Sequence, residues 1–230
     1  MKYDRLQAVT IISKVYFTPL MNNGHDTNIT DKLAKIVSGV FHPLFMPLYG
    51  LIILMTAPTF LHYLPSEVKN IILLVVFINN VLIPLALLPF FRYRNVISSY
   101  NIEEKSERII PLLTTSILYC TTSFIVFRFQ IPFFLKSFIF ATSILSILVS
   151  MINFWWKISI HSVGAGALVA TVIVLSLKLH TPLTGYLVAV ILAGGLILTS
   201  RLKLNSHNPA QVWVGFLAGF LVISLFILLI

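Results

Sequence analysis

Two histidines in the second half of the chain each stand just before a long apolar stretch, with a cation close by. Lys157 precedes His161, and Arg201 precedes His207, after which Pro209 is typical of a first helical turn. The N-terminus of a helix attracts anions, and Lys and Arg bind phosphate oxygens. Imidazole can attack an electrophile or transfer a proton near neutral pH. These residues predict a site for an anion such as phosphate, where a histidine could do chemistry.

Carboxylates are missing from the part of the chain that carries these histidines. All seven Asp and Glu residues precede Arg108. A hard divalent cation needs several anionic oxygen ligands, so the second half of the chain cannot supply such a site. A zinc site made from His42, His161 and His207 stays open as an alternative, although no closely spaced ligand motif supports it. We therefore predict a site without metal and a protein without cofactor.

The composition excludes an ordinary soluble domain. The chain has 230 residues, of which 58% are hydrophobic and only 10% charged, and its mean hydropathy is +0.96. A net charge of +9 in such a chain is typical of loops beside anionic headgroups, so we expect the lipid bilayer, not nucleic acid, as its partner. The single cysteine, Cys120, excludes a disulfide within the chain.

Apolar stretches long enough to cross a bilayer predict an all-α fold, a polytopic membrane helical bundle of six or seven transmembrane helices. The apolar stretch within residues 1–36 is too short to cross, so these residues are expected to form an interfacial or flexible arm. Residues 37–230 are expected to form one transmembrane domain. The predicted spans are 37–57, 71–91, 109–128, 133–152, 162–179, 183–200 and 209–230.

The order of the spans places the polar candidates together. With seven spans, the N-terminus and the loops 92–108, 153–161 and 201–208 share one side of the membrane. That side holds twelve of the sixteen Lys and Arg residues, namely Lys2, Arg5, Lys14, Lys32, Lys35, Arg92, Arg94, Lys105, Arg108, Lys157, Arg201 and Lys203. Because cytoplasmic loops carry an excess of Lys and Arg, we expect this polar side to face the cytoplasm.

The polar loops resemble the three signatures of the type-2 phosphatidic acid phosphatase superfamily. Ser200-Arg201, five residues and then His207 resemble its third signature, Ser-Arg-x5-His-x3-Asp, with Gln211 at the position of the Asp. Ser159 and His161 keep the spacing of its second signature, Pro-Ser-Gly-His. The stretch from Lys105 to Arg108 and Pro111 is similar in content and order to the first, Lys-x6-Arg-Pro, but not in spacing.

The resemblance implies a role for each matched residue. His207 would be the nucleophile that forms a phosphohistidine, and His161 would protonate the leaving alkoxide and then activate water. Substrate phosphate would be bound by Lys105, Arg108, Ser159 and Arg201, and Lys157 could add a contact. The family's hydrolysis needs no metal, in agreement with the missing carboxylates. The implied activity is hydrolysis of a phosphomonoester or diphosphate of a membrane lipid, in a bacterial inner membrane.

Gln211 is the main departure from the family pattern. Four residues after His207, it can share a helix face with the nucleophile and fix the imidazole tautomer. It cannot supply the negative charge that stabilises imidazolium, so we expect slower chemistry or a carboxylate borrowed from Glu103, Glu104 or Glu107. Two alternatives stay open: a lipid phosphotransferase on the same scaffold, and a membrane protein that binds or transports an anion or lipid without catalysis.

Overall fold

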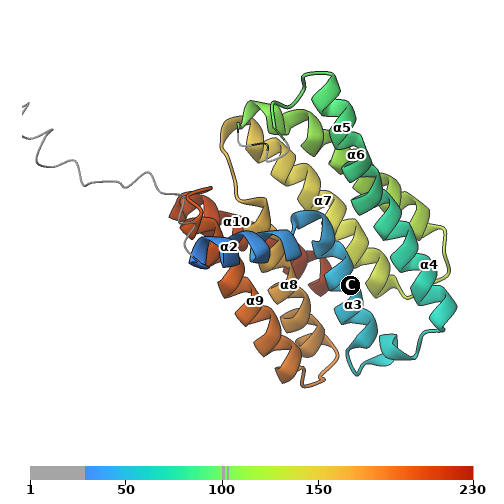
Figure 1. The fold of residues 1–230 in the computed structure, drawn as a ribbon. Coiled ribbons are helices and arrows are strands. Elements are labelled where there is room, and N and C mark those ends of the chain that lie inside the picture. The colour runs from blue at the N-terminus through green and yellow to red at the C-terminus, as the bar shows by residue number, and fades with distance from the viewer. Residues whose placement is uncertain (1–28, 100–101, 103, 230) are drawn as a thin grey trace, which may run out of the picture.

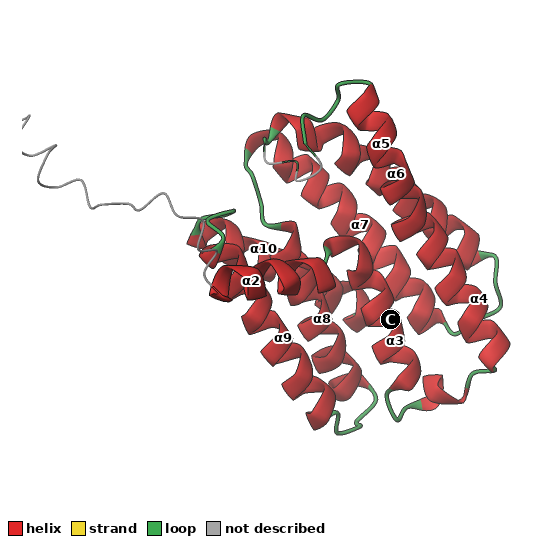
Figure 2. Cartoon of the chain, in the orientation of Figure 1, coloured by secondary structure: helices red, strands yellow, loops and turns green. Residues whose placement is uncertain are grey.

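The computed structural model describes residues 29–99, 102 and 104–229, and every regular element in this part of the chain is a helix (Figures 1 and 2). The elements are α2 (Ile29–Val40), η1 (Pro43–Phe45), α3 (Met46–Thr56), η2 (Phe60–Tyr63), α4 (Ser66–Phe77), the π-helix η3 (Ile78–Leu82), α5 (Ile83–Tyr93), η4 (Ser106–Arg108), α6 (Ile109–Phe127), α7 (Phe133–Trp155), α8 (Ile160–Lys178), α9 (Thr184–Lys203) and α10 (Pro209–Leu228).

Seven helical stretches are long and apolar enough to cross a membrane, which confirms the predicted polytopic helical bundle. They cover 29–56, 66–93, 106–127, 133–155, 160–178, 184–203 and 209–228. The boundaries agree with the predicted spans to within a few residues, except at the start of the first stretch. These seven stretches fit an integral membrane protein.

The first stretch differs from the prediction because it is a composite of α2, η1 and α3. The eleven residues of α3 rise by only roughly 16 Å, about half the thickness of a bilayer core. In Figure 1, α2 runs across the ends of its neighbours, and it contacts α9. The apolar side chains of Ile29, Leu33 and Ile36 are exposed, whereas Ala34 is buried. Of the predicted interfacial arm, residues 29–36 are therefore helical, and residues 1–28 lie outside the described part.

Helix α8 is the buried centre of the bundle and packs most closely against α10. A Cβ atom added to Gly219 would lie 1.9 Å from the carbonyl oxygen of Val163, and one added to Gly166 would lie 1.9 Å from that of Phe216. A Cβ atom at Gly215 would lie 2.7 Å from the carbonyl oxygen of Ser159. Small residues allow membrane helices to approach backbone to backbone. These contacts fix the beginning of α10 beside the beginning of α8.

Buried hydroxyl groups join the helices on the other side of the bundle. Ser116 of α6 is 2.8 Å from the hydroxyl of Ser150 in α7, and Thr122 of α6 donates to Asn80 Oδ1 at 2.6 Å. Asn80 lies in the π-helix η3, between α4 and α5. Polar side chains in a bilayer must find partners within the protein, so these bonds hold η3, α6 and α7 together.

Candidate functional site

A cavity of about 270 Å³ opens between the ends of the helices and extends into the bundle. Its polar lining includes Arg108, at the start of α6, and His161, in the first turn of α8. Arg201, in the last turn of α9, and His207, just before α10, also line it. These four predicted site residues come from three separate polar segments of the sequence. His42, which precedes η1, lines the same cavity.

The loop before α10 holds the His207 ring in one orientation. Asn208 caps α10 by accepting a hydrogen bond from the Gln211 backbone N–H at 2.8 Å, and the Gln211 side chain accepts from Asn208 N in return. This capping box carries Gln211 Oε1 to 2.9 Å from His207 Nδ1. Since a carboxamide oxygen only accepts, Nδ1 carries the proton and Nε2 keeps its lone pair. His207 therefore has the tautomer that a nucleophile acting through Nε2 needs.

Burial keeps the His207 imidazole neutral. Its side chain is only 7% exposed, and desolvation lowers its pKa to about 4. The hydrogen bond that His207 Nδ1 donates to Gln211 Oε1 raises the pKa, and the positive charges of Arg108, Arg201 and Lys157 lower it further. At neutral pH the ring is uncharged, so its Nε2 lone pair is available for attack. The lone pair is lost to protonation as the pH falls through about 4.

Ser38 of α2 joins His161 to Arg201. The Ser38 carbonyl oxygen is 3.2 Å from His161 Nε2, and the Ser38 hydroxyl accepts a hydrogen bond from Arg201 Nη1 at 3.2 Å. Because a carbonyl oxygen only accepts, His161 Nε2 carries the proton and Nδ1 is the ring nitrogen left for other chemistry. Nε of Arg201 is buried, and no group in the described residues accepts a hydrogen bond from it. A buried unpaired donor on a guanidinium is suited to an anion.

Three other predicted site residues, Lys105, Lys157 and Ser159, are not part of the cavity lining. Lys105 donates from Nζ to the carbonyl oxygens of Phe154 and Trp155, at the end of α7, at 3.1 and 3.4 Å. Ser159 is fully buried, and its hydroxyl accepts from Ser162 at 2.9 Å. Lys157 is half-buried, close enough to His207 for its charge to act on that ring. Glu103, one of the carboxylates considered for His207, lies outside the described residues.

His42 lines the cavity, although the sequence interpretation named it only as a possible zinc ligand and not as part of the phosphate site. Its ring centroid lies 5.9 Å from that of His161, in an edge-to-face arrangement. His42 is also the N-cap of η1, because its Nδ1 accepts a hydrogen bond from Leu44 N at 3.4 Å. A histidine directly before a proline has a local reason to be there, so the sequence did not mark it as part of the site. The proximity of α3 to α8 in the fold is what brings it there.

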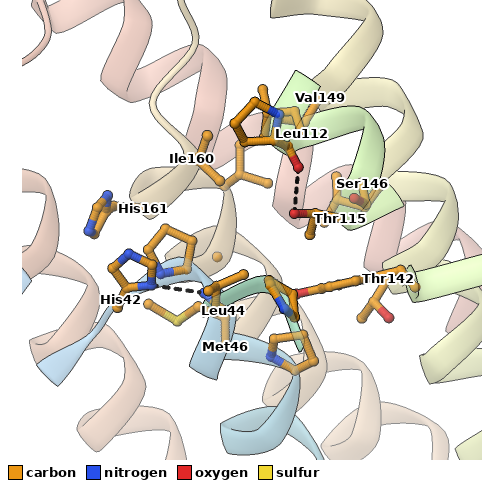
Figure 3. Close-up of a pocket in the computed structure, with 18 of the residues that line it drawn as sticks. His42, Leu44, Met46, Leu112, Thr115, Thr142, Ser146, Val149, Ile160 and His161 are labelled. Atoms are coloured by element: carbon orange, nitrogen blue, oxygen red, sulfur yellow. Dashed lines mark hydrogen bonds between the residues drawn. The ribbon is translucent and has the colours of Figure 1, made fainter. Parts of the chain in front are cut away.

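The rest of the cavity is mostly apolar and extends away from the helix ends. Along α8 the lining continues from His161 to Leu168, a rise of roughly 10 Å, and along α6 from Arg108 to Tyr119, roughly 16 Å. Figure 3 shows His42 and His161 beside each other, across the cavity from Thr115. The cavity therefore has a cationic end at the helix termini and an apolar part within the bundle.

No group of three His, Cys, Asp or Glu side chains within the described ranges lies close enough to hold a metal ion. Comparison with protein-family models, with curated proteins and with solved structures gave no match. The interpretation of the site therefore depends on its own geometry.

Proposed function

We propose that this chain is an integral membrane enzyme that hydrolyses the phosphate ester or diphosphate of a membrane lipid through a phosphohistidine intermediate. One observation carries the proposal. The imidazole of His207, held by Gln211 with Nε2 unprotonated, lines one cavity with Arg108, His161 and Arg201. The guanidinium groups supply donors for phosphate oxygens, on which charge is concentrated during phosphoryl transfer.

In the first step, Nε2 of His207 attacks phosphorus, and the bond between phosphorus and the leaving oxygen breaks. His161 enters this step protonated on Nδ1 and passes that proton to the leaving oxygen. The lipid alcohol, or the lipid monophosphate in the case of a diphosphate, departs. The phosphoryl group stays on His207, with its oxygens facing Arg108 and Arg201. Nδ1–H of His207 remains bonded to Gln211 Oε1 throughout.

In the second step, water attacks the phosphohistidine in line with the bond to Nε2. Nδ1 of His161, now unprotonated, accepts a proton from this water. The phosphorus–nitrogen bond breaks, inorganic phosphate is released, and His207 returns to its neutral form. His161 is then again protonated, so the cycle is closed without a further reactant.

The apolar part of the cavity supports a lipid as the substrate. The cationic end lies at the helix termini, where headgroups are found, and the apolar lining continues into the bundle beside it. A phosphate bound at Arg201 would place the first carbons of its chain against residues such as Leu112 and Leu168. Phosphatidic acid, phosphatidylglycerol phosphate and a polyprenyl diphosphate all have this combination of groups. A phosphotransferase that passes the phosphoryl group to a second alcohol would use the same first step.

Gln211 favours one candidate of another class, a membrane protein that binds a lipid phosphate without turning it over. A neutral amide stabilises the phosphoimidazolium less than a carboxylate would, so the intermediate would form more slowly. The cationic end of the cavity would still bind the anion. Substitution of His207 separates the two functions, because only the enzyme needs its lone pair.

We further propose that the cationic end faces the cytoplasm, as the excess of Lys and Arg on that side indicates, and that the membrane is a bacterial inner membrane. A cysteine introduced at Asn95, in the loop after α5, with Cys120 replaced by Ser, reports the side. Protection from an impermeant thiol reagent in intact cells supports the assignment, and labelling contradicts it.

The direct test is phosphate release in detergent, with EDTA present, from phosphatidic acid, phosphatidylglycerol phosphate and undecaprenyl diphosphate. We expect release by the wild type and none by His207→Ala. His62→Ala, a change in an exposed histidine of η2 outside the cavity lining, is the matched control and should retain full activity. A folded wild type that binds these lipids but releases no phosphate would refute hydrolysis and favour the binding protein. Release only on addition of an acceptor alcohol would favour the transferase.

A further inference from the structure

His42 is a third imidazole in the cavity, outside the three segments that carry the other site residues. We propose that it contacts the substrate and donates a hydrogen bond from Nε2 to the leaving oxygen, the atom between phosphorus and the lipid. This inference rests on the proposed function. It adds a residue that sets how well the enzyme expels a poor leaving group such as a lipid alcohol.

The local backbone determines which nitrogen of His42 can donate. Nδ1 accepts the hydrogen bond from Leu44 N, so it carries no proton. The proton of the neutral ring is therefore on Nε2. Within the described part of the chain, no group accepts a hydrogen bond from this nitrogen. His42 thus offers its N–H group to a ligand.

The other two imidazoles have their protons engaged by the protein. The N–H of His207 is directed to Gln211 Oε1, and that of His161 to the carbonyl oxygen of Ser38. What these two rings present to the cavity in their neutral form is a lone pair. Among the three neutral rings, His42 is therefore the donor. It would complement His161, which gives a proton to the leaving oxygen only when it is doubly protonated.

The position of His42 matches that of a leaving oxygen. It lies beside His161, with a ring separation of 5.9 Å, and Ser38 links His161 to Arg201 at the same end of the cavity. Directly after His42, the chain contributes Leu44 and further apolar residues to the lining. In Figure 3, His42 and Leu44 lie next to each other, joined by the hydrogen bond from Leu44 N. His42 therefore stands where the cationic end meets the apolar part, as the ester oxygen of a bound lipid would.

The expected effect depends on the basicity of the leaving group. During the first step the bond from phosphorus breaks and negative charge grows on the leaving oxygen. A hydrogen bond there helps most when the oxygen is a strongly basic alkoxide and least when it is a weakly basic nitrophenoxide. The His42 proton stays on Nε2 throughout, so His161 remains the acid.

Two substitutions separate the hydrogen bond from the structural role of His42. In His42→Asn, the side-chain oxygen can replace Nδ1 as the cap for Leu44 N, but no atom reaches the place of Nε2. In His42→Gln, the longer side chain can bring an amide N–H close to that place. His62→Asn, in η2 outside the cavity lining, is the control for loss of a histidine.

The experiment measures kcat/KM for 4-nitrophenyl phosphate, 4-methylphenyl phosphate and hexadecyl phosphate. The two aryl esters have similar size and differ in leaving-group basicity. We expect His42→Asn to lower kcat/KM about tenfold or more for the 4-methylphenyl and hexadecyl esters, as loss of a hydrogen bond to a charged oxygen predicts. The 4-nitrophenyl ester should change by less than about threefold, and His42→Gln should recover part of the loss.

Equal losses on both aryl esters, or no loss on any ester, would overturn the role of His42 and leave the proposed function standing. A wild type that hydrolyses none of the three esters and none of the lipid phosphates would overturn both. Abolition of all activity by His207→Ala, together with a selective effect of His42→Asn, is the result that supports both.

Discussion

Replacing Gln211 with Glu changes the charge beside His207, the proposed nucleophile, and almost nothing else. The two side chains have the same length and shape, and a carboxylate oxygen can accept from both His207 Nδ1 and Asn208 N as the amide oxygen does. The capping box of α10 is therefore retained. The substitution tests whether the neutral partner of His207 limits the reaction.

The size of the effect follows from the distance. In the wild type the pKa of His207 is about 4, and Gln211 Oε1 is 2.9 Å from Nδ1. An opposite charge at such a distance raises the pKa of a partly buried group by about 1–3 units. We therefore expect a pKa of roughly 6 in Gln211→Glu. The same charge stabilises the phosphoimidazolium, so kcat should rise by roughly tenfold at pH 8, where the ring is neutral in both proteins.

The assay is the pH dependence of kcat/KM for 4-nitrophenyl phosphate between pH 4 and pH 9. The nucleophile must be neutral, so activity falls as the pH drops through the pKa of His207. The acidic limb of the profile should therefore lie at higher pH in Gln211→Glu than in the wild type. Ionisation of the substrate is common to both proteins and does not contribute to this difference. An acidic limb that stays at the same pH, or moves to lower pH, would refute the proposed pairing of His207 with Gln211.

Two further predictions concern packing and phosphate binding. Gly219→Ala should destabilise the protein by about 1–3 kcal/mol and lower its unfolding temperature in detergent, because the new Cβ would collide with the Val163 carbonyl. Gly195→Ala in α9, where a Cβ meets nothing within 4 Å, should leave that temperature unchanged or slightly raised, and equal effects at both sites would contradict the packing argument. In hydrolysis of 4-nitrophenyl phosphate, Arg201→Gln should lower kcat/KM by roughly a hundredfold or more, because its guanidinium binds the phosphate oxygens. Lys105→Gln should change kcat/KM by less than about threefold. A larger loss in Lys105→Gln than in Arg201→Gln would refute the assignment of Arg201.

The membrane spans could be predicted from sequence because hydropathy reports them directly. Uninterrupted apolar residues have few alternatives to a bilayer helix, and the breaks between them are marked by polar and turn-forming residues. The first span was the exception. Its apolar length hides the bend at His42, between the end of α2 at Val40 and the start of η1 at Pro43, since the residues directly on both sides are apolar. The direction of α2 depends on its contacts with α9, which cannot be read from the hydropathy of the sequence.

The candidate site could be predicted only in part. Sequence spacing identified His207 and Gln211 as neighbours, and the structure places their side chains 2.9 Å apart. The expected shared helix face is not the reason, because His207 precedes α10 and the capping box brings Gln211 to it. Ser38 was missed, and His42 was named only as a possible zinc ligand, because their partners lie more than a hundred residues further along the chain. Lys105 was assigned to phosphate by its resemblance to the first family signature, and its carbonyl partners at the end of α7 depend on how two loops meet.

The packing of α8 against α10 gives the site its geometry. His161 lies in the first turn of α8, and His207 lies just before α10. Gly215 faces the carbonyl oxygen of Ser159, and Ser159 N donates to the Gln211 carbonyl oxygen at 3.3 Å. A slip of one residue between the helices would move one imidazole along the other by about 1.5 Å, more than phosphoryl transfer tolerates. Only glycine permits so close an approach of the two helices. Gly166, Gly215 and Gly219 therefore help to fix the distance between the two histidines, although none of them has a side chain.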